Sequence, residues 1–375
     1  MNRRTAEKIL HEVLSLPTAP FAEHHVIEYI RAFVANRKQV TARTDPAGNI
    51  LVRYRFGKGR VARPVCLTAH MDHPGFVAAR MVGPHRLRAH WRGSVSPEYF
   101  KGARCRFFSR GEWIRGKVSS TVTAKRGART EVKRATIHVP RPVEPGSPGM
   151  WDFPDPVVRA GRIHARGCDD LAGAAALLSC IDHLDRQRPT GDAFFLFTRA
   201  EEVGFVGAMA ACKHKTIPKR CAVVVVETSS QRSHARVGEG PILRVGDRVT
   251  TFTSAATRLC EQVANDLAAK DKGFTYQRKL MDGGMCESTA FCELGYHATG
   301  ICVALGNYHN MNTRTHKLAA EFIDLDDYAR LVKWFIALAE TKRRYTGADD
   351  ALHDRLERLQ KEYRALLRRT VSGPA

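Results

Sequence analysis

The sequence lacks the features that mark a secreted or membrane-spanning protein. The opening residues MNRRTAEKIL hold no apolar signal segment, and nowhere does a run of about 18 apolar residues occur. The ten cysteines form no CxxC pair, and several lie inside apolar runs, which excludes a disulfide scaffold. We therefore expect a cytoplasmic protein with reduced, buried thiols and no membrane partner.

Acidic residues are scarce relative to basic ones. The 375 residues include 60 Lys+Arg and 38 Asp+Glu, a net charge of +22, and residues 80–166 alone carry +13 of it. This basic block lacks the interleaved aromatic residues of a single-strand-binding surface and contains no recognised DNA-binding motif. A nucleic-acid partner is therefore not expected, whereas a solvated face and a channel for anionic substrates both stay open.

The composition, 43% hydrophobic and 26% charged, is typical of a globular protein. Strands alternate with helices after residue 162, which predicts an α/β fold with a mixed, mainly parallel sheet flanked by helices. Short alternating segments between glycine-rich turns predict a small inserted β-barrel-like domain over 79–161, ending in a linker over 139–156. The main domain then comprises 1–78 and 162–345.

Residues 346–375 form a predicted helical extension with one apolar stripe. Its members recur at spacings of four and three and are Leu352, Leu356, Leu359, Tyr363 and Leu366. This stripe is typical of a helix that docks on the chain's own surface or on a partner subunit.

Chemically active residues follow the apolar strands or precede the first helix after the insertion. They are His70, Asp72, Asp169, Asp170, Glu201, Glu202, Glu227 and His309. The functional crevice of an open α/β sheet lies beyond the carboxyl ends of its strands, so we expect these side chains to lie together. A buried carboxylate needs a partner, and His with carboxylates binds divalent metals. The pattern therefore predicts a metal site, although Asp169 and Asp170 also fit a helix N-cap.

Two ions about 3.5–4 Å apart need a carboxylate that bridges them. The predicted ligands are Asp169 as the bridge, His70 and Glu227 on one ion, and Glu202 and His309 on the other. Glu201 then points elsewhere and serves as general base toward water, passing its proton to the leaving amine. We expect Asp72 to accept the imidazole proton of His70 and so fix its tautomer. The chemistry is amide hydrolysis.

The motifs AHMD, GCDDLAG, AEEVGFVGA and VVVVET, with a final strand-end histidine, resemble the co-catalytic metallopeptidases and, within them, the M42 glutamyl aminopeptidase group. Asp72 and Asp169 are 97 residues apart, and the β-rich block fills this gap, as in M42. The M28 group has only a short gap there, and the M20 group places its extra domain after the third carboxylate. The resemblance extends to about residue 340.

The resemblance implies a zinc-peptidase-like fold, peptide substrates, a homo-oligomer and two divalent ions, Zn or else Co or Mn. It also implies the same bridge, base and terminal ligands that the strand ends suggest. The chain departs from the group at four places: Glu227 where Asp is usual, GNYHN for Arg-Tyr-x-His-Ser, GGMCESTA at 283–290 for Gly-Gly-Thr-Asp-Ala, and His73-Pro74 for a commoner Glu.

Alternatives exist for the function and for one ligand. Besides an aminopeptidase, the residues fit a related amidase or deacylase acting on a non-peptide amide, or an inactive homologue whose basic block binds a polyanion. His316 competes with His309 as the last ligand, and the distance from the strand ICVAL favours His309. If the basic block borders the site, acidic substrates would be favoured.

Overall fold

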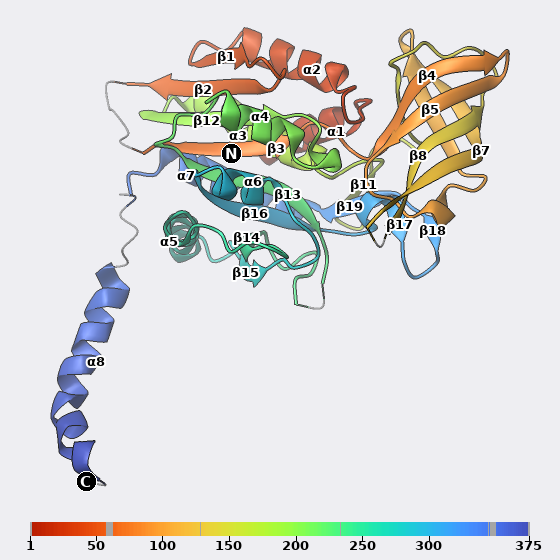
Figure 1. The fold of residues 1–375 in the computed structure, drawn as a ribbon. Helices are drawn as coiled ribbons and strands as arrows, with labels where there is room; N and C mark the ends of the chain where they lie inside the picture. Colours follow the sequence, from red (N-terminus) through yellow and green to blue (C-terminus); the bar gives the residue numbers. More distant parts are fainter. Residues whose placement is uncertain are drawn as a thin grey trace.

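An eight-stranded mixed sheet forms the body of the protein, and a separate barrel lies at one end of it (Figure 1). The computed structural model describes residues 2–57, 63–127, 129–232, 234–343, 345 and 350–373. Across the sheet the strands run β1 (Val40–Thr44), β2 (Ile50–Phe56), β12 (Gly191–Thr198), β3 (Val65–His70), β13 (Ala222–Ser230), β16 (His297–Leu305), β14 (Ile242–Gly246) and β15 (Gln277–Leu280).

The four central strands are parallel. β12 pairs with β3, β3 with β13, and β13 with β16, all in the same direction, whereas β1, β2 and β14 pair antiparallel with their inner neighbours. The carboxyl ends of β12 and β3 are in register, with Thr198 opposite His70. The predicted mixed, mainly parallel sheet is therefore confirmed, and the ends of its central strands share one edge.

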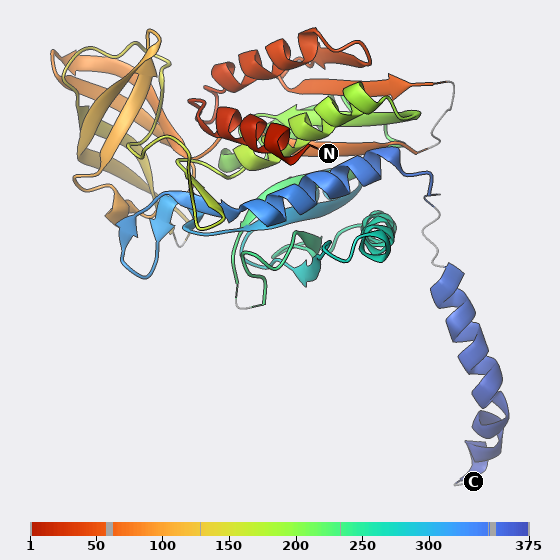
Figure 2. The same cartoon turned by 180° about the vertical axis from the view of Figure 1, so that it is seen from behind.

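Helices cover both faces of the sheet, because the central strands are apolar on both sides. One apolar cluster joins the sheet to α1 (Arg3–Leu14), α2 (His24–Ala35), α3 (Leu171–Gln187), α5 (Ser254–Lys270) and α7 (Leu325–Glu340). A second cluster joins the other face to α4 (Val206–Lys213) and α6 (Glu287–Glu293). Figure 1 shows α4 and α6 in front of the sheet, and Figure 2 shows α1, α3 and α7 from behind.

The insertion is a closed six-stranded barrel. Its strands follow the order β4 (Gly75–Gly83), β5 (Arg86–Arg92), β8 (Arg129–His138), β7 (Glu112–Arg126), β6 (Arg104–Ser109) and β9 (Pro148–Trp151). Inward-facing aromatic side chains fill it, including Phe76, Trp91 and Trp151. β9 lies in the segment predicted as a linker, and β4 begins before residue 79. The domain boundaries themselves stay a prediction.

Smaller elements connect the barrel to the sheet. β10 (Val157–Arg159), β11 (Arg162–Ala165) and β19 (Glu321–Asp324) form a three-stranded sheet, and β17 (Met311–Asn312) pairs with β18 (Lys317–Leu318). A short 3-10 turn, η1 (Pro97–Tyr99), follows β5.

All ten cysteines are free thiols, nine of them buried. Within the described residues, no helix combines the length and hydrophobicity that a membrane span requires.

The C-terminal helix α8 (Asp350–Arg369), followed by η4 (Thr370–Ser372), extends away from the sheet and the barrel (Figures 1 and 2). The five stripe residues predicted to dock are between 41% and 56% exposed. In the structure, the apolar stripe of α8 therefore does not dock on the chain's own surface. Docking on a partner subunit stays a prediction. Residues 346–349, 374 and 375 of the predicted extension lie outside the described residues.

Candidate metal centre

The structure brings all seven predicted site residues together at the carboxyl edge of the sheet. His70 ends β3, Glu227 lies near the end of β13, and Asp169 precedes α3. Glu201 and Glu202 open the short turn η2 (Glu201–Val203) after β12, and His309 lies in η3 (Tyr308–Asn310) after β16. Parallel strands thus deliver residues distant in sequence to one point.

Asp169 stands between the two histidines. Its Oδ1 lies 3.4 Å from His70 Nε2, and its Oδ2 lies 3.5 Å from His309 Nε2. Glu227 Oε1 is 3.6 Å from His70 Nε2, and Glu202 Oε2 is 3.2 Å from His309 Nε2. Two metal-compatible groups, His70–Asp169–Glu227 and Asp169–Glu202–His309, therefore share one carboxylate, each with its potential ligand atoms within 4.8 Å of one another.

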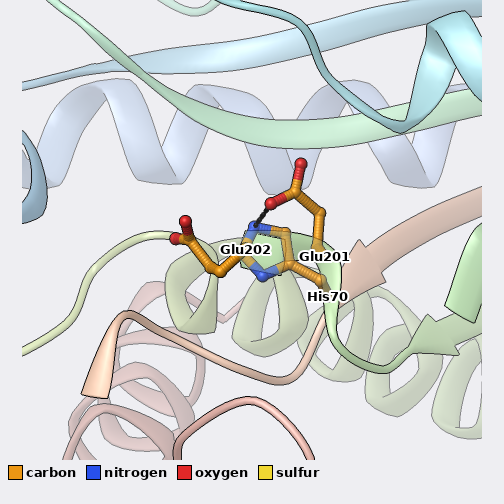
Figure 3. A group of neighbouring side chains, drawn as sticks. All are labelled: His70, Glu201 and Glu202. Atoms are coloured by element: carbon orange, nitrogen blue, oxygen red, sulfur yellow. Dashed lines mark ion pairs between the residues drawn. The ribbon is translucent and has the colours of Figure 1, made fainter. Parts of the chain in front are cut away.

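Glu201 also approaches this cluster, contrary to the expectation that it points elsewhere. Its Oε2 lies 4.0 Å from His70 Nε2, and it forms a third group with His70 and Glu202. Figure 3 shows the side chains of Glu201 and Glu202 diverging beside the imidazole. Glu201 is buried yet borders an open cleft next to the sheet edge, so its carboxylate can contact both the cluster and a bound molecule.

Several atoms of the cluster are buried without a hydrogen-bond partner among the described residues. They are Nε2 of His70 and of His309, Oδ1 of Asp169 and Oε1 of Glu202. Such orphaned polar atoms cost free energy unless something else binds them. Imidazole nitrogens and carboxylate oxygens are ligands of Zn and similar divalent ions, so the residues present fit a metal centre.

The pKa shifts of the cluster's carboxyl groups also favour a bound cation. Burial raises the pKa of Glu201 well above its usual value, and the charge of Glu227 adds to this although His70 opposes it. Burial and then the charge of Asp169 raise the pKa of Glu227 to about 8. Burial would also raise the pKa of Asp169, but the imidazoles of His309 and His70, whose Nε2 atoms lie 3.5 and 3.4 Å from its two oxygens, outweigh it and lower the pKa. The carboxylates repel one another, and a cation relieves that repulsion.

Asp72 has a different contact from the one predicted. Nδ1 of His70 donates to the backbone carbonyl of Asp72 at 3.0 Å, while the Asp72 carboxylate lies 3.6 Å from that nitrogen. The carboxylate instead accepts the backbone N–H of Glu201 at 3.0 Å and of Glu202 at 3.1 Å. The histidine tautomer is thus set by a backbone oxygen, and the Asp72 side chain positions the paired glutamates.

The last histidine is held in the cluster from both sides of the cleft. Nδ1 of His309 donates to the backbone carbonyl of Ser94, just beyond β5 of the barrel, at 2.9 Å. This leaves Nε2 facing Asp169 and Glu202. His316, the competing candidate, is exposed in the turn between β17 and β18 and belongs to none of the three groups.

Glu321 is a buried carboxylate that the sequence pattern did not single out. Its Oε2 accepts the backbone N–H of Cys168 at 2.6 Å and of Asp169 at 3.2 Å, and its Oε1 accepts that of His309 at 2.8 Å. The ring of His73 lies beside it and donates from Nδ1 to the carbonyl of Asp169 at 2.7 Å. One side chain of β19 therefore fixes the backbone of two cluster residues. The sequence feature that could have indicated its role is a glutamate within the short strand EFID.

The cluster opens into a cleft of about 870 Å³ between the sheet edge and the barrel. Its floor includes Asp169, Glu201, Glu202, Glu227 and His309, and its far wall comes from β5 and β8. A smaller pocket of about 150 Å³ adjoins the cleft at Glu227 and Tyr308. Arg232 and the buried Arg244 line this side pocket, and Arg244 Nη1 lies 3.9 Å from Glu227 Oε2.

An α/β sheet that collects a His/carboxylate cluster at its strand ends, beside an inserted barrel, has the side chains that a metal-dependent hydrolase requires. A sequence model of the M42 glutamyl aminopeptidase family matches residues 48–333, more than half of the chain. The chain therefore belongs to the M42 family of peptidases.

Individual relatives agree with this assignment. The protein named "Putative aminopeptidase" from Acetivibrio thermocellus is 25% identical over 273 residues, 69% of this chain and 76% of the relative. The TET1 peptidase of Pyrococcus horikoshii, which can assemble into a tetrahedron or an octahedral shell, has a TM-score of 0.71 at 20% identity over 89% of this chain and 99% of its own. An aminopeptidase of Desulfurococcus kamchatkensis has a TM-score of 0.72 at 18% identity, covering 90% and 95%. At these identities the two structures share the fold.

Proposed function

We propose that this protein is a dinuclear metal-dependent aminopeptidase that removes N-terminal residues from peptides. The observation that supports this most is the position of Asp169, shared by two groups of His and carboxylate side chains in which Nε2 of both histidines and Oδ1 of Asp169 lack a hydrogen-bond partner among the described residues. A pair of ions about 3.5–4 Å apart requires such a shared carboxylate. Membership of the M42 family supports the same conclusion.

In this proposal His70 and Glu227 hold one ion, Glu202 and His309 hold the other, and Asp169 holds both. Zn suits this mixed donor set best, and Co or Mn also fit it. Such ions, when bound, supply Lewis acidity that polarises a carbonyl and acidifies water. The methylene that Glu227 adds over an aspartate is accommodated, since its Oε1 already lies 3.6 Å from His70 Nε2.

Glu201 is the proposed general base. Its carboxylate borders both the cluster and the cleft, so it can take a proton from water and return it to the leaving amine. Asp72 acts through the backbone, because its two oxygens hold the N–H groups of Glu201 and Glu202. A shift of that backbone would move the base and a ligand together.

The side pocket is the proposed site for the N-terminal side chain of the peptide. It adjoins Glu227, and Arg232 and Arg244 line it, so an acidic side chain would be favoured there. We further propose a homo-oligomeric assembly, because the fold relative from Pyrococcus horikoshii forms closed shells. A cytoplasmic location agrees with the ten free thiols.

The decisive experiment combines metal analysis with a substrate panel. We expect about two divalent ions per chain, turnover of aminoacyl amides with a free amino terminus, and no turnover of their N-acetylated counterparts. Replacing Glu201 by Gln should lower kcat by roughly 10²- to 10⁴-fold while metal stays bound, the range typical for a general base. Equal cleavage of the N-acetylated compounds would instead identify an amidase or deacylase and overturn the proposal.

A further inference from the structure

Three basic side chains of the barrel line the cleft opposite the carboxylate cluster. They are Arg92 at the end of β5, and Lys133 and Arg134 on β8. None of the three lines the side pocket, which adjoins the cleft at Glu227 and includes Arg244 of β14. A peptide whose first side chain occupied that pocket could therefore extend its next residues over the cluster and toward the barrel.

Strand geometry places Arg92 close to the cluster. Side chains alternate along β5, and Trp91 points into the barrel core, where it is 3% exposed. Arg92 therefore points the other way, toward the cleft it lines. Ser94, two residues further on, accepts the hydrogen bond from His309. Two residues of extended chain span at most about 7 Å, so the backbone of Arg92 lies within about that distance of the residue that contacts His309.

A β-bulge exposes two adjacent cations on β8. Arg134 pairs with Val122 and Val132 pairs with Thr123, so Lys133 is the extra residue between two consecutive pairs of the β7–β8 ladder. Val132 remains buried in the barrel, whereas Lys133 and Arg134 are both exposed. In a regular strand, neighbouring side chains would point to opposite faces. The bulge re-aims one of them, so that both line the cleft.

Two of these cations, Arg92 and Arg134, have no ion pair among the described residues, whereas Lys133 Nζ pairs with Glu131 at 2.7 Å. The guanidinium carbon of Arg92 lies 5.4 Å from the centre of the Phe21 ring, and this contact supplies no anionic partner. The acidic cluster would attract these cations in the absence of metal, but two bound divalent ions would offset the charge of the four carboxylates Asp169, Glu201, Glu202 and Glu227. The basic wall, formed by Arg92, Lys133 and Arg134, would then give the barrel side of the cleft a positive potential.

We propose that Arg92, Lys133 and Arg134 bind a carboxylate carried by the part of the peptide beyond the scissile bond. This inference rests on the proposed aminopeptidase function and adds a substrate class to it: short peptides with an anionic group one to a few residues after the N-terminal residue. The group is either the C-terminal carboxylate or an acidic side chain. The side pocket selects the first residue, and the barrel selects the residues after it.

The test compares peptides that differ only in that charge. Release of alanine is measured from Ala-Ala-Ala as the free acid and as the C-terminal amide, and from Ala-Glu-Ala-amide. We expect kcat/KM to be about fivefold or more higher for the free acid than for the neutral amide, because each exposed ion pair supplies up to about fivefold. If Ala-Glu-Ala-amide has a kcat/KM as high as that of the free acid, an acidic side chain can supply the carboxylate. If its kcat/KM stays at the value of the neutral amide, the wall binds only the C-terminal carboxylate.

Variants assign the preference to the barrel. The triple variant Arg92→Gln, Lys133→Gln, Arg134→Gln should bring the ratio of the two kcat/KM values to about one, and high salt should lower it in the unchanged protein. Arg86, on β5, and Lys117, on β7, are exposed and do not line the cleft. Their Gln variants should keep the ratio, because they lower the net charge without touching the wall.

Two results would overturn the inference, and they differ from failure of the proposed function. A ratio near one in the unchanged protein, or an unaltered ratio in the triple variant, would show that the wall does not bind the carboxylate. Absence of cleavage of all three peptides, or full activity of the Glu201→Gln variant, would instead remove the aminopeptidase proposal and the inference with it.

Discussion

The two walls of the cleft carry charges of opposite sign, and these charges differ in how deeply they are buried. The sheet edge contributes carboxylates that are almost wholly buried, with Asp169 3% and Glu201 8% exposed, whereas the barrel contributes the exposed Lys133 and Arg134 and the half-buried Arg92. A buried charge must be compensated, so the acidic wall needs the two histidines and a cation. An exposed charge is already solvated and remains free for a ligand. Residues 80–166 carry +13 of the net charge of +22, so the overall charge gives no indication of the acidic centre at the sheet edge.

Removing the shared carboxylate should give the largest effect and would test the buried wall directly. Asp169→Asn removes the charge between His70 and His309 while preserving shape. Because loss of Lewis acidity is worth several kcal/mol, we expect activity to fall by at least about 10³-fold and bound metal to drop below two ions. Elemental analysis and aminoacyl-amide turnover measure both. Retention of two ions at full activity would contradict a bridging role.

Opening a cavity in the barrel tests whether its core supports the exposed wall. Phe76 is fully buried and contacts Trp91, Phe107 and Trp151 with ring centroids 4.6 to 5.9 Å apart. Phe76→Ala should lower the free energy of unfolding by about 3–5 kcal/mol. Val122→Ala, at a 51% exposed position of the same barrel, should change it by less than about 0.5 kcal/mol. Urea unfolding compares the two, and equal losses would refute the packing argument.

Replacing Glu321 should have the smallest effect of the three, because this residue acts through the backbone of the ligands. Glu321→Gln keeps one acceptor oxygen and loses the other. We expect metal affinity to fall by about 10- to 100-fold, as for other residues that orient ligands, with partial recovery of activity at high metal concentration. Glu293→Gln, at an exposed position, is the matched control. Activity that excess metal does not restore would argue against a positioning role.

The residues of the centre could be predicted because parallel strands end at one edge of a sheet. His70, Glu227 and His309 follow or end apolar strands, and that placement was enough to bring them together. The contacts of Asp72 were predicted wrongly, because the loop after β3 turns its carboxylate toward backbone N–H groups. Sequence spacing carries no information on such a rotation.

The part of the fold that escaped prediction lies where local patterns are weak. The β9 sequence PGMW is typical of a linker because it holds Pro and Gly, yet the barrel closes only through this strand. Gly149 in β9 is required for packing, since a Cβ there would meet the Phe107 ring at 2.5 Å. The bulge at Lys133 likewise depends on the register with β7, which no single strand encodes.

The barrel leaves the sheet after His70 and the chain returns at Asp169, and these two side chains lie 3.4 Å apart. An ion bound by both side chains would cross-link the two ends of the insertion. Closing a flexible loop costs only about 0.6 kcal/mol more for each doubling of its length, so the closure is almost indifferent to how much chain lies between. The insertion could therefore change in length or fold at little cost to this junction, provided that its replacement also supplies the carbonyl that Ser94 offers to His309 Nδ1. Such a replacement would change which molecules can enter the cleft.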